Sequence, residues 1–314
     1  MCYTFYVFTC PVKNNINLGT CFADGTSSAF LPGGSPLSSL SSSVGKTSTN
    51  LHTTFNRTSN NLFTKDVFME LLKKIEVFGD SVLKGIQLRS GNKYCVDNNI
   101  DTELLSEKFG LSITNHSKMG CTITKGAELI KRFFGGDLRS EKKDEFGVVM
   151  NYGGNDCDFN WTEISENPDA QHKPRTPLAV FEETYRKVIK ALKERGVLPI
   201  LCTMPPLEPQ KYFDWLGRGL NKANILAWLG GSVSTIYRYQ ENYSKAVERI
   251  AQTERVPLVD LRGEFLTHRR IDGFFCEDGI HPNTKGQGLI TAAFVRFAER
   301  VLHGQQVHLM YGLS

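Results

Sequence analysis

The 314-residue sequence lacks the signatures of several protein classes. It contains no Cys-x-x-Cys pair and no histidines clustered at the spacing of metal ligands, so it indicates no metal site. No stretch of 18 apolar residues occurs, and the first 15 residues lack the basic region of a signal peptide. We therefore expect neither export nor stable insertion into a membrane.

Cysteines are scattered along the chain. There are eight, and five of them lie beyond residue 68, so complete pairing of those five would leave one over. Reduced thiols are the simpler interpretation, and they are typical of a cytoplasmic protein. The sequence thus predicts a cytoplasmic location.

The chain also has only a small excess of positive over negative charge. The formal net charge is +4, and residues 1–68 contribute half of it through four Lys or Arg against two Asp. The remaining +2 is too small to argue for a nucleic-acid partner. We expect a small-molecule partner instead, and the sequence is compatible with a homo-oligomer.

The composition predicts one main domain with a polar extension. Residues 1–68 are rich in Ser, Thr, Asn and Gly without a sustained period, which predicts a disordered extension. Met69 opens the first compact stretch and is a candidate for the true start of the protein. We expect the domain over residues 69–305, with an insertion at 205–235, followed by a tail over 306–314.

Beyond residue 69, short β-branched runs alternate with longer helical periods. This alternation predicts an α/β fold with a parallel sheet and crossover helices on both faces. Strands are predicted at 73–78, 111–115, 147–151, 197–203 and 257–260. Helices are predicted at 101–109, 122–134, 177–195, 236–254 and 284–303. In the third helix, one apolar face is expected to hold Val180, Tyr185, Val188, Ile189 and Leu192.

Polar side chains and glycines follow the predicted strands, where a parallel sheet places its active site. The first strand is followed by Gly79-Asp80-Ser81, which predicts a tight turn with the Ser81 hydroxyl at the start of a helix. Gly120 lies in the loop after the second strand, and its backbone N–H can approach a ligand. Asn155 follows two glycines after the third strand, and its carboxamide can stabilise an oxyanion.

The last motif is Asp278-Gly279-Ile280-His281-Pro282, just before the final helix. Its spacing lets Asp278 hold the His281 imidazole in the tautomer that accepts a proton from Ser81. Each motif alone has a simpler structural interpretation: a helix cap at Ser81, an ordinary loop around Gly120, a surface histidine at His281. The order of all four at strand ends favours one shared pocket.

Together these motifs resemble the SGNH/GDSL hydrolase superfamily over about residues 72–303. Gly79-Asp80-Ser81 matches its first block, with Val82 in place of leucine, and Gly120, Gly153-Gly154-Asn155-Asp156 and Asp278 to Pro282 match the others. The resemblance implies a flavodoxin-like three-layer α/β/α sandwich around a five-stranded parallel sheet. It also implies ester hydrolysis without a metal or organic cofactor.

Carried over to this chain, the resemblance implies a catalytic triad of Ser81, Asp278 and His281. The backbone N–H groups of Ser81 and Gly120 and the side chain of Asn155 would form the oxyanion hole. For Asp80 and Asp156 we expect a structural role in bracing the loops.

The substrate is less defined by the sequence. Residues 205–235 are rich in aromatic and aliphatic side chains and could form an apolar lid, a dimer contact or a helical hairpin on the core. The polar loop at 156–177 favours a carbohydrate or other hydrophilic alcohol, and hence a small-acyl esterase. A lysophospholipase, a thioesterase and a non-catalytic binding protein remain alternatives, and a nucleotide-binding flavodoxin-like protein is disfavoured by Asp80 where a phosphate would sit.

Overall fold

The computed structural model describes residues 72–90, 92–96, 101–135 and 146–302. All of them belong to one compact unit, Ser59–Ser314. The predicted extension over 1–68, the candidate start at Met69 and the tail over 306–314 lie outside the described residues.

The core of this unit is a five-stranded parallel sheet, as predicted. Its strands lie in the order β4-β1-β5-β6-β7, so the second strand of the sheet along the chain flanks the first. This is the strand order of flavodoxin-like folds. The bounds are Lys74–Gly79 for β1, Ser112–Asn115 for β4, Phe146–Asn151 for β5, Leu198–Cys202 for β6 and Leu258–Val259 for β7.

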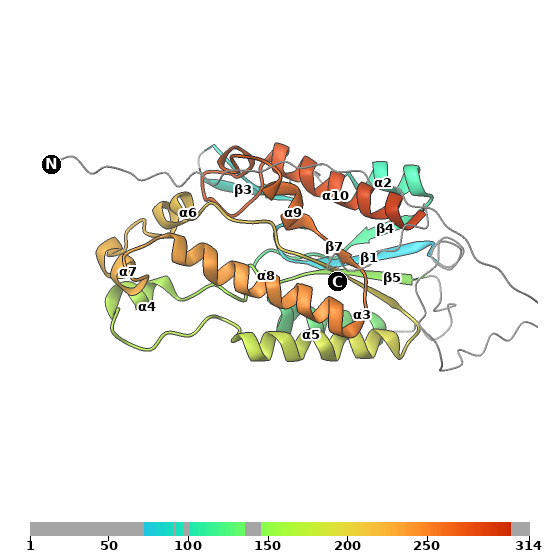
Figure 1. Cartoon of the computed structure of the whole chain (residues 1–314), viewed down its shortest axis with the longest axis horizontal. Helices are drawn as coiled ribbons and strands as arrows, with labels where there is room; N and C mark the ends of the chain where they lie inside the picture. Colours follow the sequence, from blue (N-terminus) through green and yellow to red (C-terminus); the bar gives the residue numbers. More distant parts are fainter. Residues whose placement is uncertain (1–71, 91, 97–100, 136–145, 303–314) are drawn as a thin grey trace, which may run out of the picture. The chain divides into compact units, whose positions relative to one another are not determined.

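Helices cover both faces of the sheet (Figure 1), which confirms the three-layer α/β/α sandwich. One face carries α2 (Thr102–Phe109), α9 (Leu261–Leu266) and α10 (Thr284–Leu302). The other carries α3 (Ile123–Gly135), α5 (Leu178–Lys193) and α8 (Ser234–Glu254). Among the described residues, no helix is long and apolar enough to span a membrane.

Alternation along the central strands divides the core into two apolar layers. Val148 and Met150 of β5 pack toward α3, α5 and α8, whereas Val149 between them packs toward α9 and α10. Because both faces are covered, β5 is buried along its whole length and appears in the sequence as a continuous apolar run. The five cysteines within the described residues are all free thiols.

The apolar face of α5 differs from the prediction at one position. Val180 is exposed, and Phe181 is fully buried in its place. Phe181, Tyr185, Val188 and Leu192 follow one another at spacings of four, three and four residues, so they share one stripe of the helix. Val180 lies one position away from this stripe and therefore faces solvent.

The chain after Ser81 also differs from the prediction. Instead of a helix, residues 81–85 form a single turn, in which the Lys84 N–H donates to the Asp80 carbonyl and Gly85 adopts a positive φ of 74°. Glycine tolerates this left-handed conformation, which ends the turn. The chain then forms an antiparallel hairpin of β2 (Ile86–Arg89) and β3 (Lys93–Val96) outside the main sheet.

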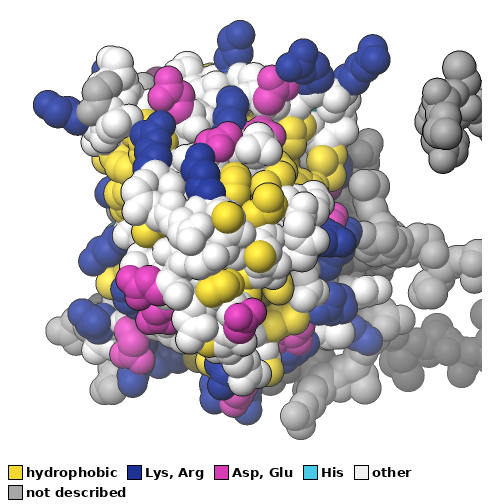
Figure 2. All heavy atoms as spheres, turned by 90° about the vertical axis from the view of Figure 1, so that its left-hand side faces the viewer, with side chains coloured by type: hydrophobic (Ala, Val, Ile, Leu, Met, Phe, Trp, Pro, Cys, Tyr) yellow, Lys and Arg dark blue, Asp and Glu magenta, His cyan; other side chains and the backbone are white. Residues whose placement is uncertain are grey.

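Residues 205–235 contain α6 (Pro209–Leu216) and α7 (Lys222–Trp228). Together with α4 (Trp161–Glu166) they lie at the left end of the view in Figure 1, beyond the sheet. Their apolar side chains form a third cluster, separate from the two layers on the sheet. Figure 2 looks at this end of the molecule and shows hydrophobic side chains in its middle, with charged side chains mostly around them.

Candidate active site

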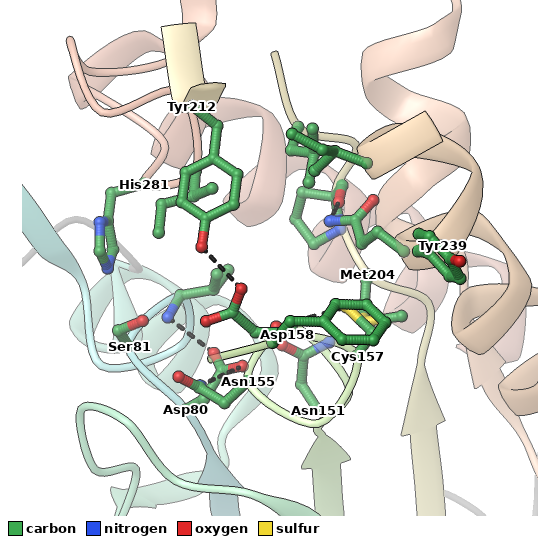
Figure 3. Close-up of a pocket in the computed structure, with 18 of the residues that line it drawn as sticks. Asp80, Ser81, Asn151, Asn155, Cys157, Asp158, Met204, Tyr212, Tyr239 and His281 are labelled. Atoms are coloured by element: carbon green, nitrogen blue, oxygen red, sulfur yellow. Dashed lines mark hydrogen bonds between the residues drawn. The ribbon is translucent and has the colours of Figure 1, made fainter. Parts of the chain in front are cut away.

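A cavity of about 80 Å³ lies at the carboxyl ends of β1, β5 and β6. The loops after these strands supply part of its wall, and α4 (Trp161–Glu166), α6, α8 and the loop before α10 supply the rest. Its lining includes Ser81, Asn155 and His281, three of the predicted site residues (Figure 3). The topological switch between β1 and its neighbours thus holds the pocket, as expected for an open parallel sheet.

Asp80 holds the turn that carries Ser81. One oxygen of its buried carboxylate accepts a hydrogen bond of 2.9 Å from the Val82 N–H, and the other accepts one of 3.4 Å from Asn155 Nδ2. Burial raises the pKa of Asp80 to about 6, although these hydrogen bonds and the nearby His281 oppose the shift. Ser81 itself is buried, and its side chain lies at the bottom left of the cavity in Figure 3.

His281 and Asp278 form a buried pair. His281 Nδ1 lies 2.7 Å from Asp278 Oδ2, and the backbone N–H groups of Ile280 and His281 donate to Asp278 Oδ1 at 3.2 and 3.1 Å. Burial raises the pKa of Asp278, but its hydrogen bonds with His281 outweigh this effect and leave the pKa below its ordinary value. The imidazole lies above the Ser81 side chain in the view of Figure 3, on the same side of the cavity.

The loop after β5 brings Asn155 to the pocket. Its carboxamide nitrogen donates to the Cys121 carbonyl at 3.3 Å and, as noted, to Asp80 at 3.4 Å, and both bonds are long. Gly153, two residues earlier, has a φ of 137°, and a Cβ there would overlap the Met204 sulfur. Only glycine fits this combination of backbone angle and close contact.

Asp156 fixes the same loop to the start of α3. Its two carboxylate oxygens lie 3.0 and 3.1 Å from the Ile123 N–H. Burial raises the pKa of Asp156 to about 7, against hydrogen bonds from Thr176 and Ile123. Asp80 and Asp156 therefore both brace loops at the pocket from buried positions.

Gly120 is not among the residues that line the cavity. It has a φ of 69° and lies in the loop after β4. Its neighbours connect this loop to the site: the Lys118 N–H donates to the Gly79 carbonyl, and the Cys121 carbonyl accepts from Asn155. The structure thus brings Ser81, Asn155 and His281 together, with Asp278 behind His281 and Gly120 at the margin.

Sequence reasoning missed a hydrogen-bonded cluster on the opposite wall. The Tyr212 hydroxyl and Trp161 Nε1 each donate to Asp158 Oδ1 at 2.8 Å, and Arg175 pairs with Asp158 Oδ2 at 3.1 Å. Burial raises the pKa of Asp158, and the three partners oppose the shift. These groups come from the 156–177 loop and from α6, and the polar Asp158 amid aromatic residues was the only signal for them in the sequence.

Potential metal ligands do not gather in the part of the chain that the structure describes. No group of three or more His, Cys, Asp or Glu side chains there could hold a metal ion. The residues at the pocket instead combine a hydroxyl, an imidazole with its carboxylate, and a carboxamide. This set suits attack on a carbonyl group and stabilisation of the resulting oxyanion.

Several solved structures resemble this chain. LAE5, an α/β hydrolase enzyme from the metagenome of Lake Arreo, Spain, is 20% identical, with a TM-score of 0.51 over 73% of this chain and 96% of its own. The lipase/acylhydrolase from Enterococcus faecalis is 20% identical and has a TM-score of 0.49, covering 75% of this chain and 98% of its own. Axe2, an acetylxylan esterase from Geobacillus stearothermophilus, is 20% identical and has a TM-score of 0.49, covering 72% and 94%. This chain and LAE5 therefore share a fold.

No curated protein matches the sequence. The GDSL-like lipase/acylhydrolase family matches residues 77–289, which is more than half of the chain. The matched span contains Ser81, Gly120, Asn155, Asp278 and His281. The chain therefore belongs to the GDSL-like lipase/acylhydrolase family and is an ester-hydrolysing enzyme of that family.

Proposed function

We propose that the protein is a serine esterase that forms an acyl-enzyme on Ser81. The observation that carries this proposal is the arrangement of the pocket. Ser81, Asn155 and His281 line one cavity, and Asp278 Oδ2 lies 2.7 Å from His281 Nδ1. Such a set meets the requirements of a nucleophile, a base, a group that orients the base, and an oxyanion donor.

In the first half of the reaction, Ser81 Oγ attacks the ester carbonyl while His281 Nε2 takes its proton. Asp278 accepts the hydrogen bond from His281 Nδ1–H and stabilises the imidazolium. The imidazolium then gives the proton to the leaving alcohol oxygen as the carbon–oxygen bond breaks. In the second half, water attacks the acyl-enzyme with His281 as base, and the acid leaves with Ser81 restored.

Asn155 is the main oxyanion donor in this scheme, together with the backbone N–H groups of Ser81 and Gly120. The hydrogen bonds of Asn155 Nδ2 are 3.3 and 3.4 Å long, so the carboxamide can turn toward a stronger acceptor at small cost. A negatively charged tetrahedral oxygen is such an acceptor. Because Gly120 lies outside the lining of the cavity, we expect it to contribute less than Asn155.

A short acyl group fits the cavity best. Its volume of about 80 Å³ is that of a few water molecules. In the view of Figure 3, Tyr212 and Asp158 lie between Ser81 and His281 on one side and Met204 and Tyr239 on the other, and a hydrogen bond joins them. We infer that this pair limits the length of the acyl chain that fits beside Ser81. We propose acetyl or similarly small esters of a carbohydrate or other hydrophilic alcohol, in line with the polar 156–177 loop at the rim.

A second candidate substrate is a longer acyl ester, such as a lysophospholipid or a thioester. The wall beyond Tyr212 is apolar and includes Phe159, Leu207 and Ile236. If Tyr212 moves on substrate binding, this wall would accommodate additional methylene groups. Acyl-chain preference separates the two candidates directly.

The test is the hydrolysis of p-nitrophenyl acetate, butyrate and octanoate by the purified protein beside Ser81→Ala. We expect the acetate ester to be turned over fastest, and activity to fall at least about 10³-fold in the variant. Turnover that persists in Ser81→Ala would contradict the scheme, and a preference for octanoate would favour the second candidate.

We also propose that the enzyme works in the cytoplasm. The five free thiols within the described residues support this location, because thiols stay reduced there. A fusion to a fluorescent protein that localised to the secretory pathway would contradict it.

A further inference from the structure

The β2–β3 hairpin places an aromatic side chain on the catalytic imidazole proposed above. The ring of Tyr94 in β3 meets that of His281 edge to face, with 5.1 Å between the ring centroids. Tyr94 is 37% exposed and is not one of the described residues that line the cavity. It therefore contacts the His281 ring without forming part of the cavity lining.

Tyr94 also interacts with the carboxylate of the pair. Burial and the negative charge of Asp278 raise the pKa of Tyr94 above its ordinary value, so the hydroxyl stays protonated. The carboxylate of Asp278 accepts hydrogen bonds from His281 and from two backbone N–H groups, and its charge reaches the Tyr94 hydroxyl.

The hairpin is itself attached to α6. Trp215 of α6 meets Tyr94 edge to face at 6.4 Å between ring centroids. The Arg218 guanidinium lies 3.9 Å from the centroid of the Trp215 ring and donates to Asn92 Oδ1 in the hairpin turn at 3.4 Å. These contacts fix Tyr94 between two elements that are distant in the sequence.

We propose that Tyr94 is a positioning residue, which holds the His281 imidazole in the orientation required for proton transfer with Ser81. The inference rests on the proposed serine mechanism. Its physical basis is that a ring fixed on one side only by Asp278 can still tilt, whereas a ring that also packs edge to face against Tyr94 cannot. A tilt that moves Nε2 by about 1 Å can cost about a hundredfold in rate.

The groups that face His281 set the expected effect of pH. They are the carboxylates of Asp278 and Asp80, the first bonded to the imidazole and the second acting through its charge, and the Tyr94 hydroxyl. The Tyr94 hydroxyl is a polar group within reach of the Asp278 charge, so removing it leaves more of that charge to support the imidazolium. The acid limb of the profile of kcat/KM against pH should then move to higher pH.

The experiment compares Tyr94→Ala and Tyr94→Phe with wild-type protein on p-nitrophenyl acetate. Val96→Ala, an exposed side chain of the same strand, is the matched control. We expect Tyr94→Ala to lower kcat by about tenfold to a hundredfold with KM within about twofold. Tyr94→Phe retains the ring, so it should recover most of kcat while its acid limb moves to higher pH.

Other outcomes overturn the inference. If Tyr94→Ala raises KM at unchanged kcat, Tyr94 binds the alcohol part of the substrate and does not position His281. If Tyr94→Ala lowers kcat no more than Val96→Ala does, Tyr94 has no positioning role. If Tyr94→Ala lowers kcat and the thermal unfolding temperature together, and Tyr94→Phe behaves like wild type at every pH, the role of Tyr94 is structural. If the wild-type protein shows no Ser81-dependent turnover, the proposed function itself fails, and the inference fails with it.

Discussion

The two walls of the pocket are constructed differently. On one wall, Ser81, Asp278 and His281 are held by hydrogen bonds within short segments, such as those from Val82 to Asp80 and from His281 to Asp278. On the other, Asp158 and Tyr212 meet from segments that are far apart in the chain. The contrast suggests that local motifs determine the chemistry and long-range packing determines which ester reaches it.

The largest expected effect on the triad wall, apart from removal of Ser81, is that of Asn155→Ala. Loss of one side-chain oxyanion donor typically lowers kcat by about 10²–10³-fold. Asn160→Ala is the matched control, because Asn160 is an exposed asparagine of the same loop whose side chain makes no cap hydrogen bond. Steady-state kinetics on p-nitrophenyl acetate measure the effect. Equal kcat values in the two variants would show that Asn155 is not an oxyanion donor.

On the opposite wall, Tyr212→Ala should change selectivity and leave the chemistry intact. Removing the ring widens the space between Ser81 and the apolar wall, so longer acyl chains gain burial worth about 0.8 kcal/mol per methylene. We expect the ratio of kcat/KM for octanoate to that for acetate to rise about tenfold or more. Tyr237→Ala, which removes a tyrosine packed against the same cluster but outside the cavity lining, is the control. An unchanged ratio with intact acetate turnover would exclude Tyr212 as the limit on acyl length.

The remaining expected effect is on stability and concerns the loop braced by Asp156. Its pKa of about 7 in the folded protein lies above the ordinary value of 3.8, so folding takes up a proton between these pH values. The stabilisation by protonated Asp156 is therefore fully present below about pH 4 and is lost as pH rises through about 7. Wild-type protein should lose stability relative to Asp156→Asn over this window, by on the order of 3 kcal/mol.

Urea unfolding of both proteins at pH 4, 5.5 and 8 measures this difference. Asp169→Asn, at an exposed position, serves as the control. A constant difference in stability between wild type and Asp156→Asn across this range would contradict the assignment of a buried, protonated Asp156.

The same contrast between local motifs and long-range contacts explains which features the sequence alone could predict. The five strands of the sheet follow from apolar runs such as Val148 to Met150, because a strand buried on both faces is apolar throughout. The site residues follow from short motifs at strand ends. The hairpin after Ser81 could not be predicted in this way, because Gly85 ends the turn and β2 and β3 are short strands outside the main sheet.

The contacts of Tyr94 and Tyr212 could not be predicted either. Tyr94 meets His281, and Tyr212 meets Asp158, only because the fold brings distant segments together. A single sequence contains the partners but not their proximity. These long-range contacts at the pocket therefore had to come from the structure.

The most direct test of the central claim is covalent labelling of Ser81. An alkyl fluorophosphonate reacts with a serine that is activated by its histidine, and intact mass followed by peptide mapping identifies the modified residue. We predict one adduct, on the peptide that contains Ser81, with no adduct in Ser81→Ala and much slower labelling in His281→Ala. Labelling at another residue, or an equal rate in His281→Ala, would contradict the account.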